Sequence, residues 1–153
     1  MKTTQNGRTS YRLHERQPHQ EPVGSEPDYV VWGELPSQLG GHGVKCEITR
    51  GPGSGCWGGC VYVEPGHPWY GVEWGDLPDE AHRAVHGGIT SSVGGRIGWD
   101  ASHYRDRRPW RDPSATHHDE RGRYVTARQA EYYTRALARL AVAAMYAAAG
   151  GAP

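Results

Sequence analysis

The sequence predicts an α+β fold, in which a small antiparallel sheet of about four to six strands packs against one long C-terminal helix. Three features predict it: short β-branched runs before residue 64, a Gly-Gly pair at 94–95 between strand-like runs, and an alanine-rich amphipathic segment near the C-terminus. The chain has 6 Trp, 9 Tyr and no Phe. We therefore expect large aromatic side chains to form much of a small core.

The N-terminal residues 1–27 are rich in Gln, Arg, His, Glu and Pro and contain almost no aliphatic side chains. Such a segment buries too little apolar surface to offset the entropy lost on ordering, so we expect a disordered arm. Residues 28–150 are then predicted to form a single α+β domain.

Three strands are predicted from β-branched, partly alternating runs at residues 28–35, 44–49 and 60–64. The glycine-rich stretch "RGPGSGCWGG" separates the last two strands as a loop. Residues 65–83 are expected to form a long connection with one helical turn near its end, and residues 105–123 a second polar loop.

The C-terminal helix is predicted over residues 127–149. Thr126 and Gln129 have the spacing of a capping box, in which a hydroxyl and an amide each satisfy a free backbone N–H. The alanine-rich end "AVAAMYAAAG" also offers a close-packing surface, which suits a homo-oligomer or packing on the chain's own sheet equally well. The face expected to cover the sheet comprises Ala130, Tyr133, Leu137, Leu140, Ala141 and Ala144.

Gly94–Gly95 predicts a two-residue hairpin turn, because glycine reaches the positive φ angles that such a turn requires. Continued outward, this register places His86 opposite His103. Asp100 falls on the opposite face unless a bulge at Gly87–Gly88 or a later turn redirects it. Small residues are expected to leave open space beside two imidazoles on the face formed by His86, Gly88, Thr90, Trp99, Ala101 and His103.

Four segments occur in the order "GCVYVEPGHPWYG" (59–71), "VHGGIT" (85–90), "IGWDASH" (97–103) and "RYVTARQAEYYTRALARLA" (123–141). Together they resemble a family of small uncharacterised phage proteins, whose recurring pattern is "GYVxVPxxHP", "VHGGLT", "GFDxAH" and a C-terminal "Y-V" helix. Trp99 stands where that family has Phe, and the Gly-Gly turn replaces a longer insertion.

No activity is established for that family, so the resemblance implies a setting rather than a reaction. The setting is a phage accessory protein, with counter-defence as one role, in the cytoplasm of the infected host cell. The resemblance also implies that the site includes the family's recurring polar positions, which here are His67, His86, Thr90, Asp100 and His103.

The first functional hypothesis is a pocket that binds, and in one version hydrolyses, a small phosphorylated or nucleotide-like ligand. Histidine suits both phosphate binding and acid–base catalysis near neutral pH, so the catalytic candidates are His86, His103, Thr90 and Asp100. Close glycine amides, aromatic rings and a guanidinium make up the ligand-binding candidates, which are Gly87, Gly88, Trp99, His67, Tyr70 and Arg105. Both an enzyme and a sequestering protein fit these residues.

Two alternatives use different chemistry. His86, His103 and Asp100 are acceptable ligands for a divalent metal ion, which would make the protein a metal-dependent hydrolase, although the first hypothesis needs no cofactor. The arginine-rich stretch 105–111 around Trp110 is typical of contacts with single-stranded nucleic acid. Its interspersed aspartates favour a solvated loop over such binding.

Net charge, hydropathy and cysteine content limit the partners and the cellular location that we expect. The formal net charge of zero argues against bulk electrostatic capture of nucleic acid or of an anionic membrane. No apolar run reaches the roughly 18 residues of a membrane span, and the N-terminus lacks a secretory signal. Cys46, Cys56 and Cys60 form an odd set without an export signal, which favours reduced thiols in a cytoplasmic protein.

Overall fold

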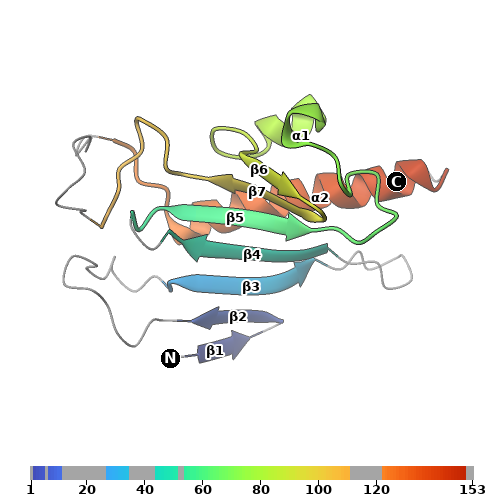
Figure 1. Cartoon of the computed structure of the whole chain (residues 1–153). Coiled ribbons are helices and arrows are strands. Elements are labelled where there is room, and N and C mark those ends of the chain that lie inside the picture. Colours follow the sequence, from blue (N-terminus) through green and yellow to red (C-terminus); the bar gives the residue numbers. More distant parts are fainter. Residues whose placement is uncertain are drawn as a thin grey trace.

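A seven-stranded antiparallel sheet and one long helix make up most of the computed structural model (Figure 1). The structure describes residues 2–5, 7–11, 27–34, 44–51, 54–110 and 122–150. In the spatial order β1-β2-β3-β4-β5-β7-β6, the strands are β1 (Lys2–Gln5), β2 (Arg8–Tyr11), β3 (Tyr29–Glu34), β4 (Val44–Arg50), β5 (Trp57–Tyr62), β7 (Arg96–Asp100) and β6 (Ser91–Val93). The predicted α+β fold is confirmed, and its sheet is larger than expected.

Two N-terminal strands enlarge the sheet. β1 and β2 pair as a hairpin, and Thr9 of β2 pairs with Val31 of β3. The prediction of a disordered arm is therefore wrong for residues 2–5 and 8–11, while residues 12–26 lie outside the described part of the chain. All side chains of β1 are exposed. Backbone pairing at a sheet edge thus holds this polar sequence without an apolar face.

The helices are η1 (Trp74–Asp76), α1 (Asp79–Arg83) and α2 (Ala127–Ala148). α1 confirms the predicted helical turn, and α2 confirms the predicted C-terminal helix. Its capping box is complete, since Gln129 N donates to Thr126 Oγ1 at 3.2 Å and Thr126 N donates to Gln129 Oε1 at 3.0 Å. Among the described residues, no helix combines the length and the apolar character needed to cross a bilayer.

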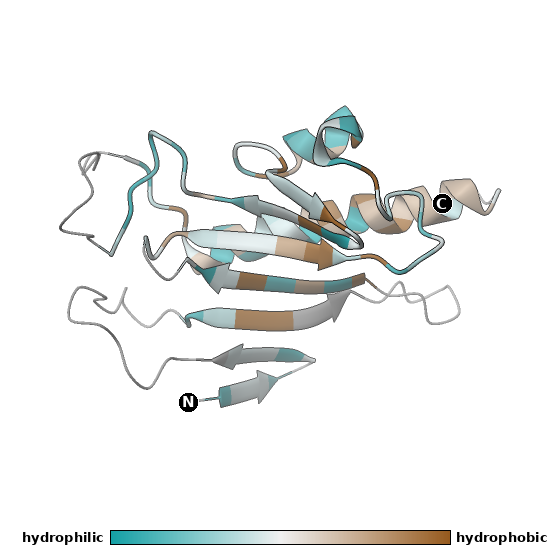
Figure 2. Cartoon of the chain, viewed as in Figure 1, coloured by the Kyte–Doolittle hydropathy of each residue, from teal (hydrophilic) through white to brown (hydrophobic). Residues whose placement is uncertain are grey.

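α2 lies across one face of β3, β4 and β5 (Figure 1). Buried apolar residues of these strands form one core cluster with residues of α2, and hydrophobic positions are marked along the strands in Figure 2. On β4 buried side chains alternate with exposed or partly exposed ones, as a half-covered strand requires. Gly59 lies under the helix, where a Cβ atom would overlap Thr134 Oγ1. The prediction that β5 begins at residue 60 is therefore wrong, because Gly58 and Gly59 belong to the strand. Gly59 is the glycine that allows the helix to approach closely.

Aromatic side chains fill the core as expected, with Trp57, Trp69, Trp99 and Trp110 all buried. The three cysteines are free and buried. The opposite face of β4, β5 and β7 carries polar side chains, and no described helix covers it (Figure 1). The face covered by α2 thus contributes to the core, and the opposite face keeps its polar side chains uncovered by a described helix.

Candidate functional site

The Gly94–Gly95 hairpin forms in the predicted register, with Ser92 of β6 opposite Ile97 of β7. Thr90 N still donates to Gly98 O at 2.9 Å, but residues 84–87 form turns and not a strand. The predicted extension of the ladder to the histidines is therefore wrong. His86 lies in the turn that follows α1, and this turn brings its ring to the loop after β7.

His86 and His103 are neighbours, and both bind one carboxylate that the sequence analysis did not select. The ring centroids lie 5.5 Å apart, edge to face. His86 Nε2 lies 2.8 Å and 3.0 Å from the two carboxylate oxygens of Asp106. Asp106 Oδ2 also accepts hydrogen bonds from His103 Nδ1 at 3.1 Å and from His103 N at 2.9 Å. We call His86, His103 and Asp106 the His-Asp cluster.

The carboxylate of Asp106 is the buried centre of this cluster. Its side chain is 5% exposed, against 20% for His86 and 36% for His103. Burial alone would raise the pKa of the Asp106 carboxyl, but hydrogen bonds from the His103 backbone and from both imidazoles lower it below its usual range. The carboxylate is ionised at neutral pH and accepts protons from His86 Nε2 and His103 Nδ1. In neutral rings this leaves lone pairs on His86 Nδ1 and His103 Nε2.

Backbone hydrogen bonds fix the loop that carries Asp106. Asp106 N donates to His103 O at 2.9 Å and closes a turn. On either side of Asp106, Arg107 N donates to Arg123 O at 3.0 Å, and Arg123 N donates to Arg105 O at 3.1 Å. The segment that leads into α2 therefore anchors the carboxylate, although Asp106 is remote from that helix in sequence.

Within the described residues, the predicted arrangement of small residues around an open space beside the two imidazoles is not formed. Gly87 has a φ of 69°, and a Cβ atom on it would overlap the His103 ring. Ala101, expected to border the space, is buried in the core. Glycine at position 87 thus allows the His103 ring to pack on the backbone.

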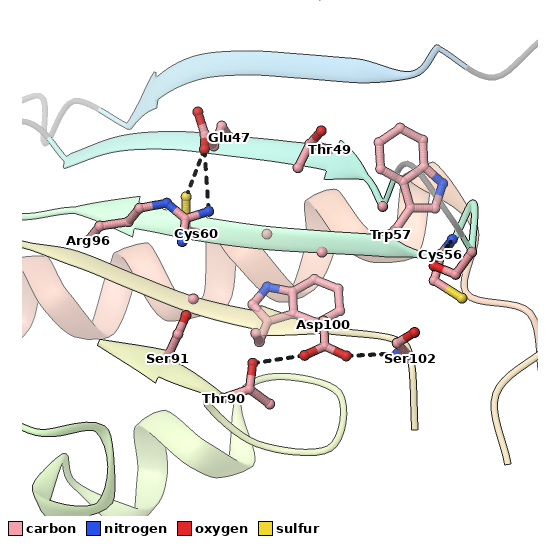
Figure 3. Close-up of a pocket in the computed structure, with 16 residues that line it drawn as sticks. Glu47, Thr49, Cys56, Trp57, Cys60, Thr90, Ser91, Arg96, Asp100 and Ser102 are labelled. Atoms are coloured by element: carbon pink, nitrogen blue, oxygen red, sulfur yellow. Dashed lines mark hydrogen bonds and ion pairs between the residues drawn. The ribbon is translucent and has the colours of Figure 1, made fainter. Parts of the chain in front are cut away.

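Thr90 and Asp100 lie together, away from the histidines. Thr90 Oγ1 donates to Asp100 Oδ2 at 2.9 Å, and Ser102 N donates to Asp100 Oδ1 at 2.9 Å. Both residues line a groove on the uncovered sheet face (Figure 3). The predicted set of His86, His103, Thr90 and Asp100 is therefore divided between two places, and Asp106 takes the position expected for Asp100.

His67 and Trp99 have structural contacts. His67 is buried, with its Nε2 2.8 Å from Ala141 O and its Nδ1 accepting from Trp69 N at 3.0 Å. Burial lowers the pKa of His67, which favours the neutral ring that these two contacts require. Trp99 is 2% exposed and donates from Nε1 to Thr134 Oγ1 at 3.1 Å. Both side chains are buried and make contacts within the fold, so the structure does not present them to a ligand beside the His-Asp cluster.

The remaining predicted ligand-binding residues are dispersed. Gly88 N donates to Val85 O at 3.4 Å, so this amide closes a turn. Tyr70 is exposed beside the hairpin turn, where it approaches Gly95. Arg105 is exposed and directly precedes Asp106 in the sequence. Of the predicted ligand-binding residues, it is the one that combines an exposed cationic side chain with a position next to the His-Asp cluster in the sequence.

Glu47 is a second polar centre that the sequence analysis missed. It accepts hydrogen bonds from Tyr62 Oη at 2.6 Å, Tyr29 Oη at 3.0 Å and Cys60 Sγ at 3.2 Å. Burial would raise the pKa of Glu47, but these hydrogen bonds and the nearby Arg96 guanidinium lower it. An acidic residue within a strand gives no sequence signal that distant hydroxyls converge on it.

The chain matches no protein-family model, and comparisons with curated proteins and with solved structures yield no match either. Functional inference therefore depends on the geometry of the chain itself. Among the described residues, the side chains of the His-Asp cluster form a group that could hold a metal ion. One potential ligand atom from each of its three residues lies within 4.8 Å of the other two.

Proposed function

We propose that this protein is a metal-dependent hydrolase that binds a divalent ion through His86, His103 and Asp106. The observation that supports the proposal is the mutual proximity, within 4.8 Å, of two imidazole nitrogens and a carboxylate oxygen. Two histidines and one carboxylate are a common ligand set of catalytic zinc and other transition metals, with positions left for water and substrate. A bound ion of this kind lowers the pKa of its water and so supplies a nucleophile at neutral pH.

The protein residues have complementary roles in this proposal. Asp106 is ionised and would supply the negative charge that a divalent cation requires. The cation would take the place of the two protons that His86 Nε2 and His103 Nδ1 share with this carboxylate, and each neutral ring would then carry its proton on the other nitrogen. His103 is the most exposed member, at 36%, so the open coordination positions are expected on its side. The contact of the His86 ring with Tyr133, at 6.1 Å between centroids, restrains the ring from the α2 side. Burial of the carboxylate and restraint of the imidazole both favour a preorganised site.

The substrate class that we propose is a small phosphorylated molecule. Arg105 and Arg107 flank Asp106, and both are exposed. A guanidinium can bind two phosphate oxygens at once, and a metal ion polarises a third. The alternative of nucleic-acid binding has less support, because Trp110 is 1% exposed and its ring is not available to stack on a base.

A second candidate function uses the same cluster without a metal ion. Asp106 fixes the tautomers of both rings, which presents His86 Nδ1 and His103 Nε2 as proton acceptors. Such a pair can supply a general base and, after protonation, a general acid for phosphoester hydrolysis. Dependence on added metal separates the two candidates.

Titration with Zn²⁺ and Co²⁺, followed by calorimetry and by visible absorption of the cobalt form, tests the metal site. We expect one ion per chain, and loss of at least tenfold in affinity for His86→Ala, His103→Ala and Asp106→Ala. Asp100→Asn is the matched control, since it alters the carboxylate expected from sequence but absent from the cluster. Metal affinity that is lost in Asp100→Asn and kept in Asp106→Ala would overturn the proposal.

Hydrolysis is tested separately with 4-nitrophenyl phosphate, with and without a chelator. Turnover that the chelator abolishes and Zn²⁺ restores supports the metal-dependent candidate. Turnover that survives the chelator yet disappears in His86→Ala supports the acid–base candidate. Equal rates for wild type and all cluster variants would exclude both.

The motif resemblance to small phage proteins supports a further part of the proposal, an accessory or counter-defence role in the cytoplasm of an infected host. Expression of the wild type and of Asp106→Ala in a bacterial host that carries nucleotide-signalling defences tests it. We expect restored plaque formation with the wild type alone. The exposed C-terminal end of α2 is the surface proposed for a homo-oligomer, which light scattering can measure.

A further inference from the structure

We propose that the groove on the uncovered sheet face binds a small cation that carries a primary ammonium group, with Asp100 as its counter-ion. The groove has a volume of about 430 Å³, within the range of roughly 300–1,000 Å³ usual for small-molecule sites. It lies on the face opposite α2, whereas the His-Asp cluster contacts Tyr133 of that helix. The inference is therefore independent of the proposed hydrolase function.

Glycines create the hollow. Gly58 of β5 and Gly98 of β7 lie at its floor, where larger residues would place side chains. One wall is formed by Glu47 and Thr49 of β4, and the opposite wall carries hydroxyl groups and a carboxylate from Thr90, Ser91, Asp100 and Ser102 (Figure 3). The result is a polar trough that follows β5 and has hydrogen-bonding groups along both sides.

The Asp100 carboxylate is positioned before any ligand binds. Thr90 Oγ1 holds Oδ2 and Ser102 N holds Oδ1, each at 2.9 Å. Each carboxylate oxygen has a second lone pair, so both can still accept a proton from an ammonium group. Glu47, by contrast, already accepts from Tyr62, Tyr29 and Cys60. Asp100 is therefore the ligand-binding carboxylate, and Glu47 is a structural one.

The charge of the groove lining favours a cation. The lining contains two carboxylates, Glu47 and Asp100, and one guanidinium, Arg96, which lies 3.7 Å from Glu47. Arg96 thus compensates Glu47, and Asp100 is the remaining charged group of the lining, with Arg108 behind it donating to Ser102 O at 3.2 Å. An ammonium group would donate a charge-assisted hydrogen bond to Asp100, which a phosphate would not.

The lining also argues against ligands that need aromatic stacking. Trp57 and Trp99 border the groove, but they are 0% and 2% exposed. The Trp57 ring packs against the Arg50 guanidinium, and the Trp99 ring donates to Thr134 of α2. Nucleobases and most sugars gain much of their affinity from an accessible ring. Hydroxyl groups such as those of Thr49 and Ser91 are suited instead to accept the remaining protons of an ammonium group.

Calorimetric titration with 1,4-diaminobutane at neutral pH tests the inference. We expect binding to wild type and a loss of about tenfold or more in Asp100→Asn, which removes the charge and keeps the oxygen that accepts from Ser102. Asp79→Asn is the matched control, because Asp79 lies on α1 with its side chain 87% exposed, and its affinity should equal that of wild type. His86→Ala should also bind the diamine normally, which keeps this result distinct from failure of the metal site.

A second variant tests the volume of the groove without changing its charge. A Cβ atom at Gly98 would lie 2.8 Å from Ser91 Oγ, a side-chain tip that can rotate away. Gly98→Ala should therefore fold and weaken diamine binding by reducing the hollow. Equal diamine affinity in wild type and Asp100→Asn, absence of diamine binding to wild type, or stronger binding of inorganic phosphate or glycerol would each overturn the inference.

Discussion

The imidazole rings of His86 and His103 meet edge to face with centroids 5.5 Å apart, although the strand pairing that predicts their meeting ends near Thr90. What unites them is the buried carboxylate of Asp106, to which both rings donate. The Asp106 side chain therefore couples the turn after α1 to the loop after β7, and backbone hydrogen bonds of Arg105 and Arg107 join that loop to the lead-in to α2.

Asp106→Asn should lower the free energy of unfolding by about 1–3 kcal/mol, because the amide leaves buried donors without their charged acceptor. The pKa of Asp106 is lowered from its ordinary value of 3.8. A carboxyl with a depressed pKa stabilises the fold fully above its unfolded-state pKa and loses this contribution as the pH falls below it. Urea unfolding at a series of acidic pH values should show a weaker decline for Asp106→Asn than for wild type. A parallel decline in both proteins would contradict the assignment.

Local patterns predict the parts of this fold that depend on neighbouring residues. Thr126 and Gln129 identify the start of α2, and Gly94–Gly95 identifies the hairpin with its register, because each feature is completed within a few residues. Polar β1 has no such local signal, since its stability derives from backbone pairing at the sheet edge. The sheet is larger than expected for this reason.

The candidate site depends on contacts that no local pattern encodes. Asp106 lies in a polar loop among arginines, where an aspartate ordinarily indicates solvent exposure. Its burial depends on pairing between its loop and Arg123, a relation between segments that are distant in sequence. Side-chain alternation along an extended strand likewise predicts that Thr90 and His86 lie on the same face of the sheet. In the structure, residues 84–87 form turns instead of a strand, so the two side chains are separated. Sequence identified both histidines, but not the carboxylate that joins them.

His67 should make stability depend on pH through its burial. The pKa of this ring is lowered from its ordinary value of 6.5 mainly by burial, with the Ala141 carbonyl opposing the change. The folded state therefore resists a proton that the unfolded state accepts, and its stability falls as the pH decreases below about 6.5. His67→Gln should reduce this decline in urea unfolding while leaving metal affinity unchanged. Loss of metal binding in this variant would reassign His67 to the functional site.

The cysteines should be inert in the native protein. Burial, together with the adjacent charge of Glu47, raises the pKa of Cys60 to about 12. Only about one thiol in ten thousand is then a thiolate at pH 8, and that thiol is also inaccessible. We expect no alkylation of Cys60 by iodoacetamide in the native state and full alkylation in urea, measured by mass spectrometry of the peptide. Rapid native labelling would show that the Glu47 network opens.

Gly59→Ala should be among the most destabilising single-methyl additions in this chain. A Cβ atom there would overlap Thr134 Oγ1 and lie 2.7 Å from Trp99 Nε1, at the closest approach of α2 to the sheet. Overpacking of this kind costs about 1–3 kcal/mol. Gly75→Ala is the control, because no atom lies within 4 Å of its Cβ position, and it should be nearly neutral.

A double variant separates overlap from other effects of the glycine substitution. Thr134→Ala alone should destabilise the protein, since it leaves the buried Trp99 Nε1–H without its acceptor. It also removes the hydroxyl that the new methyl group would strike. In the Gly59→Ala/Thr134→Ala protein, the loss of unfolding free energy should therefore be smaller than the sum of the two single losses. Additive losses in thermal or urea unfolding would mean that backbone conformation, and not helix approach, requires glycine at this position.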